Sequence, residues 1–208
     1  MKAIVCHELS GPAALRLEEV PEPRPGPGQV RIRVRACGVN FADSLISRGQ
    51  YQVQPQPPFS PGFEVAGEVL ERGPEVRGIA VGDRVIGMVG HGGYAEQVVA
   101  SANRCVPMPA AMSWEHGAAF PVVFGTSHIA LWHRARLRAG ETLVVHGASG
   151  GVGLTAVVIG KRLGATVIAT ASSSQKLEVA RRHGADHLID TGHEDLRTRI
   201  QEWTAGRC

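Results

Sequence analysis

The sequence predicts two dissimilar halves: a β-rich N-terminal part and a C-terminal α/β part with parallel strands. The first hundred or so residues contain short apolar or alternating segments separated by Gly and Pro, which is typical of a barrel or a sandwich. From Thr142 onward the pattern alternates strand and helix three times, which indicates parallel strands joined by right-handed crossovers. A glycine-rich turn at residues 147–153 opens the first of these helices.

The composition is that of an ordinary globular protein. The 208 residues are 43% hydrophobic and 20% charged, enough for two modest domains or one large one. The net charge of +3 is a mild excess. Arg31, Arg33 and Arg35 alternate with apolar residues and lack interleaved aromatics, which favours the solvated face of a strand over a nucleic-acid surface.

Membrane insertion and secretion are not expected. No apolar run approaches the ~20 residues that cross a bilayer, and His7 and Glu8 follow the N-terminus too soon for a signal peptide. The four cysteines show no C-x-x-C spacing and no disulfide-like density. These observations favour a reducing, cytoplasmic setting.

The expected elements of the first part are strands, interrupted by a proline-rich connector at 21–28 that cannot form a helix or a central strand. A second such loop spans 55–61. The expected strands are 3–6, 15–20, 30–37, 64–70, 84–88 and 95–99.

The pattern changes at Ser113, which is a good N-cap for a helical stretch that runs to Trp132. Pro121 and Gly125 lie inside it and predict two helices or a kinked one. The last part is then expected to contain strands at 143–146, 166–170 and 187–189 and helices at 152–163, 175–183 and 194–203.

The glycine-rich turn carries the first functional prediction. Ala148, Gly150 and Gly153 occupy the positions of an A-x-G-x-x-G fingerprint, in which small residues let backbone N–H groups approach a pyrophosphate. The alternative is a tight strand-to-helix turn without a ligand, and the strand–helix alternation that follows favours a dinucleotide site. The candidate contacts are Ala148, Ser149, Gly150, Gly151, Val152 and Gly153.

The end of the second parallel strand indicates which dinucleotide binds. An NAD site carries an acidic residue there for the ribose hydroxyls, whereas this chain has Ser172, Ser173 and Lys176, which suit a 2′-phosphate. The alternative is that Ser174 only caps the next helix and Lys176 is a solvated surface residue. We expect NADPH as the cofactor.

Five motifs occur in order along the whole chain: Asn40-Phe41-x-Asp43, Pro61-Gly62-Phe63-Glu64-x-x-Gly67, Gly82-Asp83-Arg84-Val85, Gly92-Gly93-Tyr94-Ala95-Glu96 and Gly147-Ala148-Ser149-Gly150-Gly151-Val152-Gly153. Together they resemble the zinc-free quinone oxidoreductase (zeta-crystallin-like) branch of the medium-chain dehydrogenase/reductases. The resemblance implies a GroES-like β domain at 1–120, an NADPH-binding Rossmann domain at 121–208, and hydride transfer to quinones or other α,β-unsaturated carbonyls. It also implies a homodimer for a full-length chain.

Metal binding is not expected. Zinc-dependent relatives carry a cysteine where Asn40 stands and a histidine where Phe63 stands, and neither Asn nor Phe replaces those ligands in a tetrahedral site. The cluster of four cysteines for a structural zinc is also missing between Val89 and Tyr94.

The resemblance places Asn40, Tyr51 and Asp43 at the catalytic cleft and Thr126 against the cofactor. Without a metal, the substrate carbonyl must be polarised by hydrogen bonds, which the Asn40 amide and the Tyr51 hydroxyl could donate. Each residue has a structural alternative: a turn residue for Asn40, packing for Tyr51, helix-terminal bonding for Thr126, and a first-turn helix carboxylate for Asp43, where we favour the structural role.

The chain also departs from the family. Leu45 stands where some relatives carry a pocket tyrosine, and Thr191 replaces an aromatic residue near the adenosine half of the cofactor. The sequence contains only the first βαβαβ half of a Rossmann domain, which predicts an incomplete, truncated domain and poor activity. The alternatives are therefore an enoyl-thioester reductase, a non-catalytic NADPH-binding or structural (crystallin-like) protein, or an inactive fragment.

Overall fold

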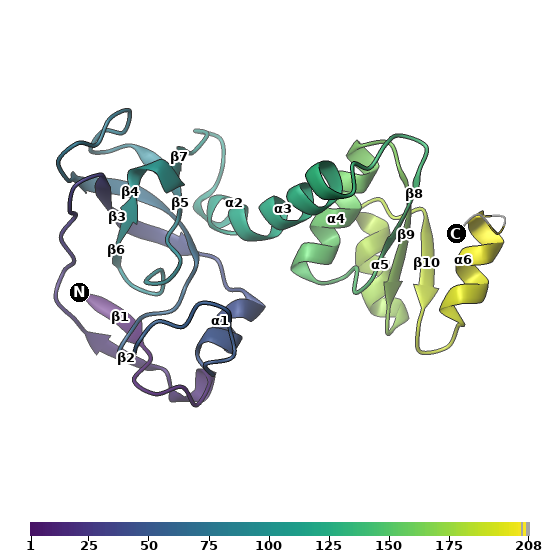
Figure 1. Ribbon diagram of the computed structural model, residues 1–208, viewed down its shortest axis with the longest axis horizontal. Coiled ribbons are helices and arrows are strands. Elements are labelled where there is room, and N and C mark those ends of the chain that lie inside the picture. The colour runs from purple at the N-terminus through teal and green to yellow at the C-terminus, as the bar shows by residue number, and fades with distance from the viewer. Residues whose placement is uncertain (205, 207–208) are drawn as a thin grey trace. The chain divides into compact units, whose positions relative to one another are not determined.

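The computed structural model describes residues 1–204 and 206 (Figure 1). The described chain divides into two compact units, one spanning Met1–Val122 and one beginning at Val123. Each unit has its own hydrophobic core, built on a β-sheet in both cases.

The first unit is β-rich, as the sequence predicts. Five strands form an antiparallel sheet in the order β6-β3-β4-β5-β7, and β1 pairs with β2 in a separate two-stranded sheet. The short strand β7 was missing from the predicted elements, because three residues are too few for a periodic pattern. The strands are β1 Lys2–Val5, β2 Arg16–Glu19, β3 Gln29–Cys37, β4 Glu64–Arg72, β5 Arg84–Met88, β6 Gln97–Ser101 and β7 Cys105–Pro107.

Alternation along β3 builds the core of this unit. Val30 and Ile32 are fully buried against Val65 of β4, because successive side chains of a strand point to opposite faces of the sheet. Each such side chain contributes roughly 1.5–3 kcal/mol of hydrophobic stabilisation when it leaves water.

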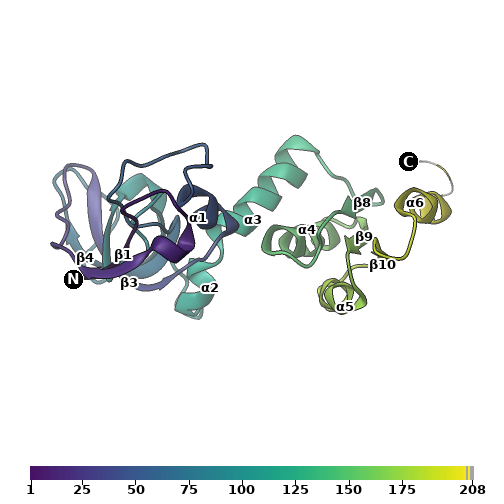
Figure 2. The same ribbon diagram turned by 90° about the horizontal axis from the view of Figure 1, so that it is seen from below.

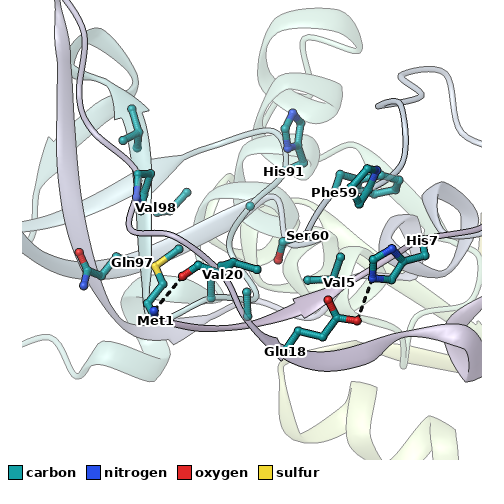
Figure 3. A pocket seen from close by; sticks show the side chains of 16 residues that line it. Met1, Val5, His7, Glu18, Val20, Phe59, Ser60, His91, Gln97 and Val98 are labelled. Carbon is teal, nitrogen blue, oxygen red and sulfur yellow. Dashed lines mark hydrogen bonds and ion pairs between the residues drawn. The ribbon is translucent and has the colours of Figure 1, made fainter.

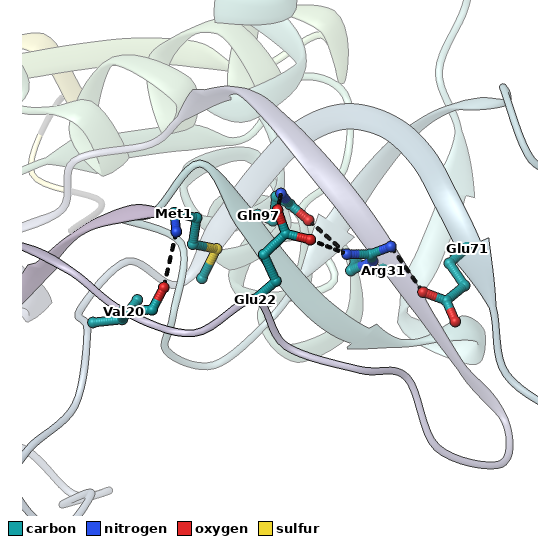
Figure 4. A network of polar contacts seen from close by, with 6 residues as sticks. All are labelled: Met1, Val20, Glu22, Arg31, Glu71 and Gln97. Carbon is teal, nitrogen blue, oxygen red and sulfur yellow. Dashed lines mark hydrogen bonds and ion pairs between the residues drawn. The ribbon is translucent and has the colours of Figure 1, made fainter.

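Arg31, on the opposite face of β3, is less solvated than the sequence predicts. Its side chain is 19% exposed and lies in a polar network that ties the proline-rich connector to the sheet (Figure 4). Its Nη1 donates to Glu22 Oε2 (2.7 Å), and its Nη2 pairs with Glu71 Oε2 (2.9 Å). Gln97 Nε2 donates to the other oxygen of Glu22 (3.0 Å), and these two donors lower the pKa of Glu22. Arg33 and Arg35 are exposed, as expected.

The helical stretch after Ser113 is broken into three short pieces. Ser113 caps α2 (Trp114–Ala118), because its Oγ accepts from the His116 amide at 3.2 Å. Helix α3 (Pro121–His128) begins at the proline and continues into a π-helical segment, η3 (Ile129–Arg134). The predicted interruption is confirmed. Helix α1 (Phe41–Ile46) was implied only by the favoured role of Asp43 as a first-turn helix carboxylate, because six residues are too few to show a helical period. Two 3₁₀ turns, η1 (Pro12–Ala14) and η2 (Ala102–Arg104), complete the first unit.

The second unit is a three-stranded parallel sheet in the order β10-β9-β8, with helices on both faces. Helices α4 and α5 cover one face and α6 lies over the other (Figures 1 and 2). This is one βαβαβ half of a Rossmann fold, as predicted. Its elements are β8 Thr142–Val145, α4 Gly151–Arg162, β9 Thr166–Ala171, α5 Ser174–Arg182, β10 His187–Asp190 and α6 Leu196–Thr204.

In the described part of the chain, no helix combines the length and apolarity that a bilayer crossing requires.

Candidate functional site

The glycine-rich turn joins β8 to α4, the position that the fingerprint requires. Gly147 takes a left-handed conformation (φ 60°) and starts the turn. A Cβ on Gly153 would lie 2.4 Å from the carbonyl oxygen of Gly147, so only glycine fits where the helix passes this close to the turn. Ala148 is fully buried, and its amide donates to the Thr170 carbonyl of β9 (3.0 Å). The turn is therefore held to the sheet by its own backbone.

The first turn of α4 offers free donors at its N-terminus. Gly150 is the N-cap and has no side chain to accept from them. The amides of Gly151, Val152 and Gly153 lie in the first turn, where a helix supplies no intrahelical acceptor. Such a terminus also carries partial positive charge, and an anion bound there would accept from several amides at once.

A pair of buried hydroxyls fixes the start of α4. Ser127 of α3 is 1% exposed, and its Oγ lies 2.9 Å from the Val152 carbonyl oxygen and 2.7 Å from Thr155 Oγ1. Thr155 Oγ1 in turn lies 3.0 Å from the carbonyl oxygen of Val123, which it reaches as a donor. The predicted contact Thr126 is the exposed neighbour of Ser127. Sequence reasoning missed Ser127 and Thr155, since small hydroxyl residues in helices carry no pattern of their own.

Ser172, Ser173 and Lys176 lie together at the carboxyl end of β9. Lys176 Nζ donates to Ser172 Oγ (3.2 Å), and both residues are exposed. The residue that caps α5 is Ser173, whose Oγ accepts from the Lys176 amide at 3.5 Å. The alternative assignment of Ser174 as the cap is therefore wrong, because Ser174 already has a helical position.

Thr191 stands at the end of β10 beside this group. Its amide and its Oγ1 both donate to the carbonyl oxygen of Ala171, at 3.0 and 3.2 Å. The residue that replaces the family's aromatic side chain thus joins the ends of two neighbouring strands.

In the first unit, Asn40 is the N-cap of α1, and two carboxylates surround it. Its backbone amide donates to Asp43 Oδ2 and its side-chain Nδ2 donates to Glu64 Oε1, both at 2.8 Å. Asp43 is 6% exposed, and its other oxygen accepts from the Gly62 amide (2.9 Å). Both Asp43 oxygens thus have backbone partners, which is the arrangement of a first-turn helix carboxylate.

Burial shifts the titration of the groups around these carboxylates. It raises the pKa of Glu64, which is 1% exposed, and it raises the pKa of Cys37 to about 12. Burial beside Asp43 also raises the pKa of Tyr94. These shifts keep Cys37 and Tyr94 neutral at physiological pH.

Glu64 is the residue of this group to which sequence reasoning gave no role. It was quoted only as part of the Pro61–Gly67 motif. The signal that could have found it is an acidic residue at the start of a strand whose next residues, Val65 and Ala66, are apolar and buried. A buried carboxylate needs hydrogen-bond donors to offset the cost of its burial, so an acidic residue at such a position indicates that donors lie nearby.

Tyr51 lies in the loop after α1, half-buried against Phe63. The two rings meet edge to face, with centroids 5.3 Å apart. Gln54 Nε2 donates to the carbonyl oxygens of Gly49 and Tyr51 and so stabilises the loop. Tyr51 therefore packs against the residue that directly precedes Glu64.

A separate apolar cavity of about 360 Å³ lies beside β1 and β2 (Figure 3). Its lining includes Val5, Val20 and Phe59. His7 and Glu18 also line it, with His7 Nε2 2.8 Å from Glu18 Oε1. None of the predicted site residues lines it. Among residues 1–204 and 206, no group of three or more His, Cys, Asp and Glu side chains could hold a metal ion.

Comparison with known proteins gives the family. The alcohol dehydrogenase GroES-like domain family matches residues 26–110, and the family described as zinc-binding dehydrogenase matches residues 151–207. Rat quinone oxidoreductase-like protein 2 is 40% identical over 202 residues, which are 97% of this chain and 57% of that protein. Mouse quinone oxidoreductase is 39% identical over 192 residues, which are 91% of this chain and 58% of that protein.

Solved structures agree with these relatives. Escherichia coli quinone oxidoreductase complexed with NADPH matches with a TM-score of 0.95 and 33% identity, over 100% of this chain and 64% of that one. Thermus thermophilus quinone oxidoreductase, solved alone and with NADPH, matches with a TM-score of 0.86 and 37% identity, over 98% of this chain and 64% of that one. The chain belongs to the quinone oxidoreductase branch of the medium-chain dehydrogenase/reductases. It spans a little over half the length of the curated relatives named above.

Proposed function

We propose that this chain carries the NADPH site and the carbonyl-polarising residues of a zinc-independent oxidoreductase that reduces quinones or other α,β-unsaturated carbonyls. The observation that carries the proposal is the glycine-rich turn between β8 and α4, with a lysine–serine pair at the end of the next strand. The relatives named quinone oxidoreductase and the two neighbours solved with NADPH support it.

The proposed cofactor site in the second unit is made of backbone groups at one end and side chains at the other. The amides of 151–153 and the small residues of 148–150 would receive the pyrophosphate, and Thr126 of α3 is the further proposed contact. Ser172, Ser173 and Lys176 would bind the 2′-phosphate, where Lys176 neutralises charge and the two hydroxyls donate hydrogen bonds. When bound, NADPH supplies the hydride.

The proposed catalytic residues, all in the first unit, are Asn40, Tyr51 and Asp43. An amide nitrogen has two hydrogens, and Asn40 spends one on Glu64, so one N–H remains to polarise a substrate carbonyl. The Tyr51 hydroxyl would donate a hydrogen bond or a proton to the developing enolate. Asp43 would act indirectly, because one of its oxygens accepts from the Asn40 amide at the start of α1 and the other accepts from the Gly62 amide before β4.

The residues at the two positions that hold zinc ligands in zinc-dependent relatives support the proposed zinc independence. Asn40 makes an amide hydrogen bond, and Phe63 packs against an aromatic ring; neither provides a thiolate or an imidazole. We assign residues 1–120 to the catalytic domain and 121–208 to the cofactor domain. A cytoplasmic setting is supported by Cys6, Cys37 and Cys105, which are free.

Enoyl-thioester reduction and NADPH binding without catalysis are the alternative functions. The chain spans 57–58% of the two relatives named above, so activity and dimer formation are proposed for the whole protein. A homodimer is accordingly proposed for a full-length protein only.

Two measurements test the proposal on this chain. Fluorescence titration should show tighter binding of NADPH than of NADH, and equal or tighter NADH binding contradicts the assignment of Ser172 and Lys176. Oxidation of NADPH with a panel of quinones, enones and enoyl thioesters distinguishes the functions. Binding without turnover of any acceptor would support the non-catalytic alternative.

A further inference from the structure

Glu64 is a buried carboxylate whose two oxygens serve two different parts of the first unit. Oε1 accepts from Asn40 Nδ2 (2.8 Å), and Oε2 accepts from the backbone amide of Val122 (2.7 Å). At 1% exposure the side chain has little access to water, so these donors have to offset the cost of its burial.

The absence of a side chain at Gly38 leaves room for the Glu64 carboxylate. A Cβ on Gly38 would lie 2.3 Å from Glu64 Oε1 and 2.7 Å from the Ala118 carbonyl oxygen. Any side chain at residue 38 would therefore displace the oxygen that Asn40 contacts. The Gly38 amide donates to the Glu64 carbonyl oxygen (3.1 Å), which holds the two residues side by side.

The partner decides how the Asn40 amide is turned. An ionised carboxylate can only accept hydrogen bonds, so it selects the orientation in which Nδ2, and not Oδ1, faces Glu64. The remaining N–H and the Oδ1 oxygen then have fixed directions. An Asn side chain without this partner can turn over and exchange donor for acceptor.

We infer that Glu64 is the positioning residue that fixes the orientation of the Asn40 side-chain amide and thereby its free hydrogen-bond donor. The inference rests on the proposed function for the role of that donor in the reaction. The orientation itself is independent of the reaction and is measured separately.

The orientation can be tested on the unaltered chain. The sequence has two asparagines, Asn40 and Asn103, so labelling with ¹⁵N-asparagine gives only two side-chain amide groups in the NMR spectrum. One Asn40 amide proton should exchange with solvent at least ~10-fold more slowly than those of Asn103, since it is hydrogen-bonded to a buried acceptor. Equal exchange for both asparagines would overturn the inference.

The functional role is tested by a double-mutant cycle of Glu64→Gln and Asn40→Ala. Gln keeps the volume but offers one oxygen to the two donors, so turnover should fall on the order of 10-fold while the KM for NADPH stays unchanged. Glu68→Gln, on the same strand but paired with Arg35 at the surface, is the matched control and should keep full turnover.

In the Asn40→Ala background, Glu64→Gln should have no further effect, because the group that it positions is absent. An equal loss in both backgrounds would show that Glu64 acts elsewhere and would overturn the inference. Full activity of Asn40→Ala alone would instead refute the proposed role of Asn40, while the exchange measurement still decides whether Glu64 holds the amide.

Discussion

The candidate residues of the two units differ in chemistry. In the second unit, the proposed phosphate-binding part is mainly backbone: a turn of small residues, three first-turn amides and a strand end. In the first unit, the proposed catalytic part is made of side chains, where Asn40 is held between two buried carboxylates. A backbone site depends on where side chains are absent, whereas a side-chain site depends on which partners the fold brings together. Mutations should therefore act through steric exclusion in one half and through lost hydrogen bonds in the other.

The largest effect is expected for Gly153→Ala. The added Cβ would lie 2.4 Å from the Gly147 carbonyl oxygen, so the turn must move and the amides of α4 lose their alignment. We expect a stability loss of roughly 1–3 kcal/mol and no measurable NADPH binding. Urea unfolding and fluorescence titration measure the two effects. Gly150→Ala is the control for stability, since its Cβ would be 3.4 Å from the same oxygen. A Gly153→Ala chain that binds NADPH normally would show that the turn is no phosphate site.

A smaller loss is expected for Ser127→Ala. Removal of the hydroxyl leaves the Val152 carbonyl and Thr155 with one partner fewer at the start of α4. The expected cost is about 1–2 kcal/mol in the free energy of unfolding, measured by urea denaturation. The exposed neighbour gives the contrast: Thr126→Ala should leave stability unchanged and weaken NADPH binding. If Thr126→Ala lowered stability and Ser127→Ala only weakened NADPH binding, Thr126 would be the structural residue and Ser127 the cofactor contact.

Lys176→Ala should distinguish the two nicotinamide cofactors. The ammonium lies at Ser172 at the end of β9, where a 2′-phosphate would be bound. NADPH affinity should fall ~10-fold and become less dependent on salt, with NADH affinity unchanged, because only NADPH carries the phosphate. Arg182→Ala, which removes a charge paired with Glu178 on the same helix, is the control. An equal loss of affinity for both cofactors would contradict the assignment.

The smallest effect concerns Cys37 in the first unit. Burial raises its pKa from about 9 to about 12, so the native state resists ionisation in a range where the unfolded state ionises. Stability from this thiol is complete below pH 9 and is lost as the pH rises toward 12, by at most about 1.4 kcal/mol per pH unit. The unfolding free energy at pH 8 and pH 10 should therefore differ less for Cys37→Ser than for the unaltered chain. An identical pH dependence in both proteins would show that Cys37 does not titrate in this way.

The same comparison explains which predictions the sequence supported. The glycine-rich turn, the strand–helix alternation and the interruption after Ser113 depend on residues close together in the chain, and the structure confirms them. The six-residue helix α1 and the short strand β7 are too short to give a periodic pattern. Such a pattern also does not fix the cap of a helix to the residue, as at Ser173. The partly buried Arg31 was misjudged because Glu22, Glu71 and Gln97, which remove it from water, come from three other segments.

The sequence by itself determined the β-rich unit, the βαβαβ half and the place of the glycine-rich turn, since each follows from local spacing of apolar and small residues. Only the tertiary structure decided how the Asn40 amide is held. Asn40 and Glu64 are 24 positions apart in the sequence, and their contact exists because β3, α1 and β4 meet at one end of the sheet. A buried carboxylate is stable there only because folding brings two donors to it, and neither donor is visible from its own segment of the chain.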